Sequence, residues 1–323
     1  MLKVLLARVQ QGHRTSAFPD QPPALPDRFR GLPVLDSSRC VDGCRACVEA
    51  CPTGAISATE ERALPASPVA EPRRAEHPEA GLRLDLGRCL FCPECVQACP
   101  EGAIAFTTDH RLAARTRDGL VLRGPEEYPY AAALDAGLRR LFGRSLKLRV
   151  VSAGGCNGCE SDVNVLGTPV FDLGRFGIQY VASPRHADGL LITGPVTENM
   201  RLALKKTYDA IPPPKIVIAV GACAISGGPY IDHAEQHNGA DAVVPVDLYV
   251  PGCPPHPFTI LDGLLRLLGR IDERAAQARA EVLRRYRGEI RDESIEWGTT
   301  RAEEGVKYLG LGAQPTDSDR RKP

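Results

Sequence analysis

The sequence has no long apolar run and no excess charge of either sign. Lysine and arginine together number 40, as do aspartate and glutamate, so the formal net charge is zero. A nucleic-acid partner would normally require a basic surface, so we expect none. No stretch approaches the roughly 18 consecutive apolar residues of a membrane span. The apolar run within residues 1–6 is too short for a signal-peptide core, which predicts a cytoplasmic chain.

Cysteine, by contrast, is abundant, and its 12 residues fall into sets of four with none left over. The sets are Cys40, Cys44, Cys47 and Cys51; Cys89, Cys92, Cys95 and Cys99; and Cys156, Cys159, Cys223 and Cys253. A 4Fe–4S cluster takes four thiolates, so the count predicts three such clusters. Disulfides are the alternative, but they would require export from a reducing compartment.

Composition divides the chain into five segments. We expect an extended, proline-containing docking segment (1–35), a two-cluster ferredoxin domain (36–110), a linker with a helix near Tyr130–Phe142 (111–145), a further cluster domain (146–270) and a charged C-terminal extension (271–323). The only tryptophan, Trp297, falls in this extension, where we expect a docking contact rather than a redox role.

The second cysteine set matches the bacterial ferredoxin run in full, since Cys89, Cys92, Cys95 and Cys99 are followed by Pro100. In two-cluster ferredoxins the fourth cysteine of each run binds the other cluster. The pattern therefore predicts two crossed ligand sets. One is Cys89, Cys92, Cys95 and Cys51, and the other is Cys40, Cys44, Cys47 and Cys99. Each run ends in Cys-Pro and a short apolar strand, which indicates an α+β ferredoxin duplication.

The first run departs from this pattern because three residues, not two, separate Cys40 from Cys44. Gly43 is expected to absorb the extra residue through an unusual backbone angle. A 3Fe–4S cluster or an altered potential is an alternative at this position. Zinc is the alternative for the whole region, since Cys-x2-Cys pairs also bind zinc, but the duplicated Cys-Pro endings favour a ferredoxin.

Strand and helix patterns alternate after residue 145. Short apolar strands are expected at Leu146–Ser152, Ile178–Ala182, Leu190–Thr193 and Lys215–Val220, with helices at Glu198–Asp209 and Pro257–Leu268. Such alternation predicts a flavodoxin-like, doubly wound parallel α/β sheet. The third cysteine set lies in glycine-containing loops that follow strand candidates. These loops should converge at the carboxyl edge of the sheet, where sites form.

The residues around the third set carry a family resemblance. Cys156-Asn157-Gly158-Cys159-Glu160, the Gly-Ala-Cys-Ala-Ile-Ser-Gly-Gly run at Cys223 and the Val-Pro-Gly-Cys-Pro-Pro run at Cys253 resemble the small-subunit fold shared by NiFe hydrogenases and the 20 kDa subunit of complex I. In complex I the first two ligands are typically adjacent. The spacing of Cys156 and Cys159 points instead to group 4, energy-converting hydrogenases of the formate hydrogenlyase type, here fused to their two-cluster ferredoxin subunit.

The resemblance implies an oxidoreductase subunit that relays electrons through three 4Fe–4S clusters and has no catalytic site of its own. The expected partners are a separate NiFe large subunit, membrane-embedded subunits and an upstream donor such as formate dehydrogenase or ferredoxin. Attachment to the cytoplasmic face of the membrane would be peripheral, through these partners. A complex I-like quinone-reducing module is the alternative function.

Two further residues near the third set are weaker candidates. Glu160 follows Cys159, and we expect a structural carboxylate rather than a proton relay. His256 follows Cys253-Pro254-Pro255, where a hydrogen bond toward the cluster and ordinary interface packing are equally supported.

Overall fold

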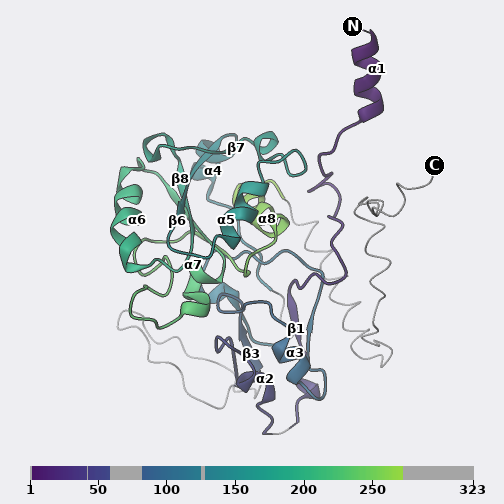
Figure 1. Ribbon diagram of the computed structural model, residues 1–323, viewed down its shortest axis with the longest axis vertical. Coiled ribbons are helices and arrows are strands. Elements are labelled where there is room, and N and C mark those ends of the chain that lie inside the picture. The colour runs from purple at the N-terminus through teal and green to yellow at the C-terminus, as the bar shows by residue number, and fades with distance from the viewer. Residues whose placement is uncertain (1, 42, 59–81, 125–127, 272–323) are drawn as a thin grey trace, which may run out of the picture. The chain divides into compact units, whose positions relative to one another are not determined.

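The computed structural model describes residues 2–41, 43–58, 82–124 and 128–271. Within these ranges the chain folds into a ferredoxin-like part, built mainly from the earlier residues, and an α/β part built from the later ones (Figure 1). Residues 272–323, and with them the expected C-terminal extension and Trp297, lie outside the described residues.

The N-terminal segment is not extended throughout, because Leu2–Gln11 forms helix α1. The expectation for residues 1–35 was wrong here. All five prolines of the segment come later, from Pro19 onward, whereas leucine, lysine, arginine and glutamine favour a helix. Beyond the helix the segment does contact the α/β part. The backbone amide of Ser16 donates to the carbonyl of Val170, and the Arg175 guanidinium donates to the carbonyl of Phe18 at 2.6 Å.

The two ferredoxin motifs interleave their strands. The elements are β1 (Pro33–Leu35), α2 (Ala46–Glu49), β2 (Ile56–Ala58), β3 (Leu82–Asp85), α3 (Glu94–Ala98) and β4 (Ile104–Phe106). The strand before the first motif, β1, pairs antiparallel with β4 after the second, and β2 pairs antiparallel with β3. This exchange brings the two cysteine runs side by side, and α2 contacts α3. The strands expected after each Cys-Pro are confirmed as β2 and β4.

The linker is more ordered than its sequence indicated. Strand β5 (Val121–Leu122) pairs with β3 and so extends the ferredoxin sheet. Helix α4 covers only Ala136–Phe142, shorter than the expected Tyr130–Phe142. Asp135 sets its start, because its carboxylate accepts hydrogen bonds from the backbone amides of Gly137 and Leu138.

The α/β part contains the predicted parallel sheet. Its strands are β6 (Leu146–Ser152), β7 (Ile178–Tyr180), β8 (Gly189–Thr193), β9 (Ile216–Val220) and β10 (Leu248–Val250), in the order β10-β9-β8-β6-β7. All neighbouring pairs are parallel. Numbered by appearance within this sheet, the order is 2-1-3-4-5, which is the flavodoxin-like order. The predicted fold class is therefore confirmed.

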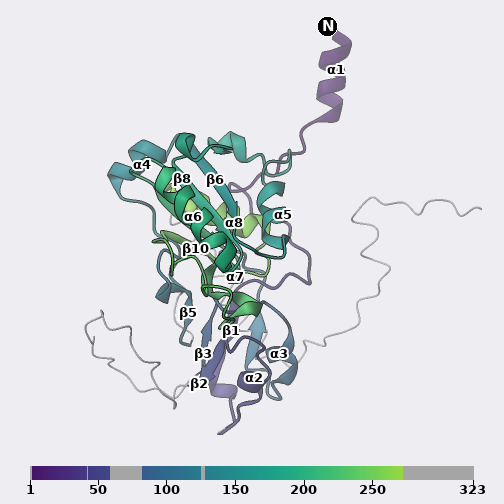
Figure 2. The same cartoon turned by 60° about the vertical axis from the view of Figure 1, so that its left-hand side comes forward.

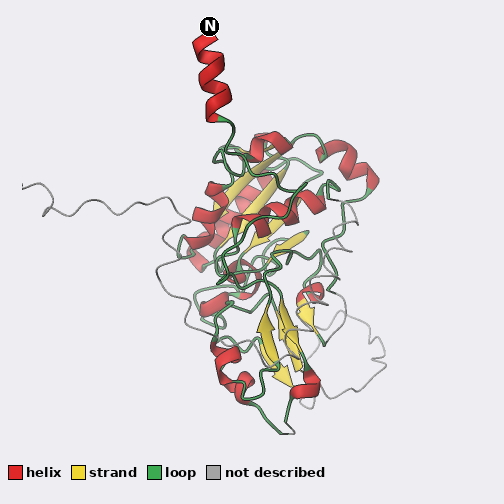
Figure 3. Ribbon diagram, turned by 90° about the vertical axis from the view of Figure 1, so that its right-hand side faces the viewer, coloured by secondary structure: helices red, strands yellow, loops and turns green. Residues whose placement is uncertain are grey.

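Helices cover both faces of this sheet, as Figures 2 and 3 show. They are α5 (Gly158–Val165), α6 (Glu198–Ala210), α7 (Ala222–Ser226) and α8 (Pro257–Leu267), and short 3₁₀ turns lie at Ser37–Arg39, Asp118–Leu120, Leu173–Phe176, Pro184–His186 and Gly228–Tyr230. Neighbouring residues of β8 pack in two different hydrophobic cores, one on each face of the sheet. Leu191 packs in the cluster that contains α5 and α8, whereas Leu190 packs in the one that contains α6. That second cluster continues into the ferredoxin-like part.

The strand order creates a switch point between β6 and β8. The connections from these two strands leave in opposite directions, so their carboxyl ends open a crevice in which α/β proteins bind ligands. Cys156 follows β6, and Cys223 and Cys253 follow β9 and β10 at the same edge.

Candidate iron–sulfur sites

The first site is a hollow beside α2. Its lining includes Cys40, Cys44 and Cys47 from the first motif and Cys99 from the second, together with Arg39 and Leu82. Cys99 thus lies beside the first three cysteines of the first motif, as the predicted crossing requires. Burial raises the pKa of Cys47, and the nearby thiolates of Cys99 and Cys40 raise it further. Gly43 has φ = +75°, the left-handed backbone expected to absorb the extra residue in this run.

The second site gathers the remaining ferredoxin cysteines. Burial raises the pKa of Cys89 to about 12, and the thiolates of Cys95, Cys51 and Cys92 contribute to the rise, although the Phe91 amide opposes it. Burial likewise raises the pKa of Cys95 to about 11, and the charges of Cys92 and Cys51 raise it further. The reciprocal crossed cysteine, Cys51, thus lies among the thiolates of the second motif.

Backbone amides point at three of the ferredoxin sulfurs. Ala55 N donates to Cys51 Sγ at 3.1 Å, and Ala103 N donates to Cys99 Sγ at 3.2 Å, in each case four residues after the cysteine. Phe91 N donates to Cys89 Sγ at 3.3 Å. Such N–H···S contacts are among the levers that set the potential of an iron–sulfur cluster.

The third site lies at the carboxyl edge of the parallel sheet. Burial raises the pKa of Cys159, and the charges of Cys223, Cys253, Glu160 and Cys156 raise it further. Burial also raises the pKa of Cys223, to about 12, and the charges of Cys253 and Cys156 are the next largest contributions to this rise. The four cysteines, which are up to 97 positions apart in sequence, are therefore electrostatic neighbours.

Glycines make room for these sulfurs. A Cβ on Gly221 would lie 2.4 Å from Cys159 Sγ, and one on Gly228 would lie 2.9 Å from Cys223 Sγ. Gly221 also has φ = +91°, a conformation that a side chain disfavours. The backbone can therefore approach the sulfurs closely only because these positions carry glycine.

The chemistry of the donor sets fits iron–sulfur clusters. A buried thiolate is costly without a cation, and metal ligation requires the deprotonated form. Four of the twelve cysteines are buried, Cys47 at the first site, Cys89 and Cys95 at the second and Cys223 at the third. Among the described residues, no three or more His, Cys, Asp or Glu side chains converge closely enough to hold a single ion. A cubane spreads its four ligands over different irons, so its ligands need not converge on one point.

The second site is adjacent to each of the other two. Burial and the charges of Cys92 and Cys51 raise the pKa of Cys95 most. The charge of Cys47, from the first site, raises it further. Burial and the charge of Cys156 raise the pKa of Cys253 most. The charge of Cys92, from the second site, raises it further. Charges from the first site thus reach the second, and charges from the second reach the third.

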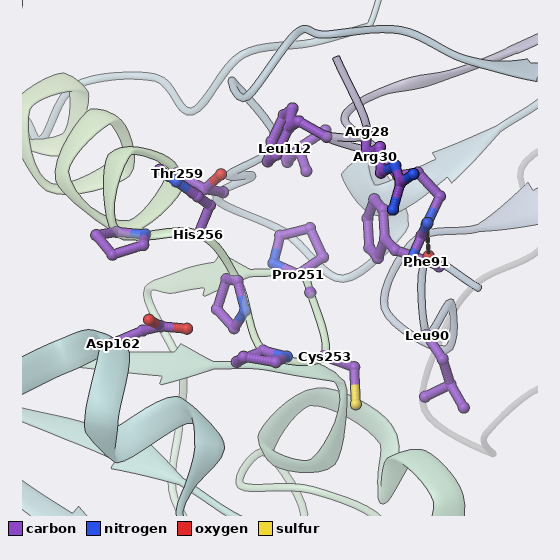
Figure 4. A pocket seen from close by; sticks show the side chains of 15 residues that line it. Arg28, Arg30, Leu90, Phe91, Leu112, Asp162, Pro251, Cys253, His256 and Thr259 are labelled. Atoms are coloured by element: carbon purple, nitrogen blue, oxygen red, sulfur yellow. Dashed lines mark hydrogen bonds between the residues drawn. The ribbon is translucent and has the colours of Figure 1, made fainter. Parts of the chain in front are cut away.

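A cavity of about 310 Å³ lies beside Cys253, between the two parts of the chain. Figure 4 shows Arg28, Arg30 and Phe91 on one side of it and His256, Thr259 and Asp162 on the other. Arg30 Nε donates to the carbonyl of Phe91, which ties the N-terminal segment to the loop of the second site.

His256 has a structural role in this wall. It is the N-cap of α8, where its Nδ1 accepts a hydrogen bond from the amide of Phe258 at 3.2 Å. Its ring stacks on Phe258 and meets Phe29 edge-on, and burial lowers its pKa. Of the two roles considered for His256, packing is therefore the one with observed contacts.

Glu160 is a buried carboxylate, only 8% exposed. Its Oε1 accepts hydrogen bonds from Ser152 Oγ and, at 2.7 Å, from Thr193 Oγ1. Burial would raise its pKa, but these two hydrogen bonds outweigh that effect and hold the pKa below its usual value. This arrangement supports the expected structural carboxylate.

Sequence reasoning missed the residues that join the two parts. Ser226 Oγ donates to the carbonyl of Gly87 at 2.8 Å, which links α7 to the loop before Cys89. Sequence reasoning also missed an ion pair within the ferredoxin-like part, where Arg117 holds Asp85 through two contacts, at 2.7 and 2.6 Å. Ser226 does belong to the run around Cys223, but nothing in its spacing indicated a partner 139 positions away.

Models of known protein families match both parts of the chain. Residues 156–267 match the family model described as "NADH ubiquinone oxidoreductase, 20 Kd subunit", and residues 36–103 match a "4Fe-4S dicluster domain". None of the helices in the described ranges combines the length and apolar character needed to cross a bilayer.

Several known proteins are similar to the chain. Formate hydrogenlyase subunit 7 of Escherichia coli is 45% identical over 143 residues, which are 44% of this chain and 56% of that protein. The probable membrane-bound hydrogenase subunit mbhJ of Pyrococcus furiosus is 43% identical, over 42% of this chain and 81% of that protein. A NADH-quinone oxidoreductase subunit of Clostridium beijerinckii is 46% identical, over 35% of this chain and 68% of that protein. The chain thus spans little more than half of the first relative and most of the second.

Proposed function

This chain belongs to the family of the 20 kDa subunit of NADH ubiquinone oxidoreductase, and we propose that it is the electron-transfer subunit of a membrane-associated NiFe hydrogenase complex. The observation that carries the proposal is the gathering of the third cysteine set at the switch point of a flavodoxin-like sheet, next to Cys92. The two residues between Cys156 and Cys159 match the spacing of hydrogenases. The relatives named as hydrogenlyase and hydrogenase subunits support the same conclusion.

Three 4Fe–4S clusters are the proposed cofactors, one for each site. Cys40, Cys44, Cys47 and Cys99 hold the first, Cys89, Cys92, Cys95 and Cys51 the second, and Cys156, Cys159, Cys223 and Cys253 the third. When bound, such clusters take up and release single electrons, often near about −400 mV in ferredoxins. The domain limits that we propose, 36–110 and 146–270, enclose these ligands.

We propose that electrons pass through the three sites in order, with the second site in the middle. Cys47 neighbours Cys95, and Cys92 neighbours Cys253, so the second site is the middle one. Burial of Cys89, Cys95 and Cys223 keeps water from the sulfurs. Two cysteines are exposed at the first site, Cys40 and Cys44, and two at the third, Cys156 and Cys253, so either end can face another protein. We place the large subunit at the third site.

The catalytic NiFe centre then belongs to a separate large subunit, because every thiolate of this chain is already assigned. We place the upstream donor, such as formate dehydrogenase or a ferredoxin, at the first site. Attachment to the cytoplasmic face of the membrane is through partner subunits. If the chain remained in the soluble fraction of lysates whose membranes retain the rest of the complex, this attachment would be wrong.

The function is tested on the complex purified from its native host through a tag on this chain. We expect nickel in the complex, more than about 12 irons per copy of this chain (about 12 from three 4Fe–4S clusters and the rest from the NiFe centre and other subunits), and H2-dependent dye reduction. A complex that lacks nickel and shows no H2-dependent reduction would exclude the hydrogenase function.

A complex I-like quinone-reducing module is the second candidate. The similarity to a subunit of a NADH-quinone oxidoreductase favours it, whereas the spacing of Cys156 and Cys159 argues against it. The same purified complex distinguishes the two functions. NADH- or ferredoxin-dependent quinone reduction without nickel would support the module, and nickel with H2 oxidation would support the hydrogenase.

A further inference from the structure

Glu160 bridges two strands at the switch point of the parallel sheet. Its hydrogen-bond donors, Ser152 and Thr193, are the last residues of β6 and β8, and they are directly paired in the parallel ladder. Glu160 itself lies in the first turn of α5, one residue after Cys159. One carboxylate oxygen therefore joins the helix that carries a sulfur ligand to the two strands between which the site opens.

The surroundings of Glu160 leave little room for another arrangement. Thr193 is fully buried, and Glu160 is 8% exposed. The loops that follow β6 and β8 also approach each other closely, because a Cβ on Gly194 would lie 2.6 Å from Gly155 N. A Cβ on Gly155 would lie 3.9 Å from Glu160 Oε1. The carboxylate is thus held at one position beside the third cysteine set.

A fixed negative charge beside a cluster makes the addition of an electron less favourable. The interaction between two charges weakens with distance and with exposure to water, so a buried carboxylate acts more strongly than an exposed one. Net charge and hydrogen bonding near a cluster are among the factors that set its potential. Within the described ranges, no lysine or arginine donates a hydrogen bond to Glu160, whose side-chain donors are both neutral hydroxyls.

We propose that the Glu160 carboxylate positions α5 at the third site and lowers the reduction potential of the cluster held there. The inference rests on the proposed function, because it requires that Cys156, Cys159, Cys223 and Cys253 hold a cluster. It assigns Glu160 as a positioning residue whose charge tunes the cluster, and gives it no role in proton transfer.

Redox titration of the purified complex, monitored by electron paramagnetic resonance, tests the proposal. Glu160→Gln removes the charge and keeps the size, and we expect the midpoint potential of the third cluster alone to shift upward. Glu198→Gln is the matched control. Glu198 also lies in the first turn of a helix, α6, which follows strand β8. Its side chain is 48% exposed, so solvent should screen its charge. Equal shifts in the two variants, or none in Glu160→Gln, would overturn the proposal.

A second pair of variants covers the case in which Glu160→Gln does not load with iron. Glu160→Asp keeps the charge on a shorter side chain, and Glu160→Asn is its neutral counterpart. The neutral member of this pair should again have the higher third-cluster potential. If both acidic forms bind iron at the third site and neither neutral form does, the carboxylate is needed for assembly and the tuning role is refuted. A wild-type complex without a third cluster would instead contradict the proposed function.

Discussion

Ser226 Oγ donates a hydrogen bond to the carbonyl oxygen of Gly87 at 2.8 Å and thereby joins the α/β part to the ferredoxin-like part. Ser226 ends α7, the helix that carries Cys223, and Gly87 lies two residues before Cys89. Both residues are buried. This hydrogen bond therefore links the backbone of the second site to that of the third.

Replacing Ser226 by alanine should loosen this link. The buried Gly87 carbonyl would lose its hydrogen-bond donor, which costs about 1–3 kcal/mol. We expect faster hydrogen exchange at residues 86–92 and at α7, measured by mass spectrometry on the intact complex. Ser161→Ala is the control, because Ser161 Oγ donates only within its own part of the chain, to the carbonyl of Asn157 at 3.0 Å. Unchanged exchange in Ser226→Ala would show that other contacts hold the two parts together.

Gly221→Ala should disrupt the third site. Its Cβ would lie 2.4 Å from Cys159 Sγ, so the sulfur would have to move. We expect the variant to lose about four irons per chain, the content of one 4Fe–4S cluster. Gly12→Ala is the matched control, because Gly12 also has a positive φ, +60°, but an added Cβ there meets nothing within 4 Å. Full iron content in Gly221→Ala would contradict the ligand assignment of Cys159.

The crossing of the fourth cysteines can be tested with paired variants. Cys99→Ala and Cys40→Ala should abolish or alter the same paramagnetic signal, because both sulfurs line the first hollow. Cys51→Ala and Cys89→Ala should together alter a different signal, that of the second site. If Cys99→Ala resembled Cys89→Ala instead, each run would bind its own cluster and the crossing would be wrong.

His110 should make the protein less stable in acid. Burial lowers its pKa to about 4, from 6.5, and its Nε2 has no hydrogen-bond partner among the described residues. The unfolded chain binds the proton more tightly than the folded one. The free energy of unfolding should therefore decrease as the pH falls from about 6.5 toward 4. At about 1.4 kcal/mol per pKa unit, the loss should be roughly 3 kcal/mol.

His110→Phe provides the comparison for this acid effect. The ring of His110 packs against Phe18 and Phe258, so phenylalanine suits the surroundings. Denaturant unfolding of both proteins at several pH values should show a smaller loss of stability below pH 6.5 in the variant. Parallel pH profiles would mean that His110 titrates normally.

Local patterns predicted much of the fold. Leu146–Ser152 was expected as a strand and is β6 in full, and the expected helix at Pro257–Leu268 is α8 to within one residue. Both are bounded by features that act locally, such as an apolar run or a proline at the first turn. The N-terminal helix was not predicted, because the prolines that indicate an extended chain begin only at Pro19, beyond the helix Leu2–Gln11. The ligand roles of the twelve cysteines remain predictions.

By itself the sequence determined the inventory of sulfur ligands, their grouping by spacing and the alternation of strands and helices, because each of these depends on residues that are near one another in the chain. Only the tertiary structure decided that the second cysteine set is adjacent to each of the other two, that Glu160 joins the ends of β6 and β8, and that Ser226 contacts Gly87. The last two relationships join residues 33 and 139 positions apart, and packing, not spacing, brings them together. The contacts that we propose to set the potential and the rigidity of the electron path are therefore ones that no local pattern encodes.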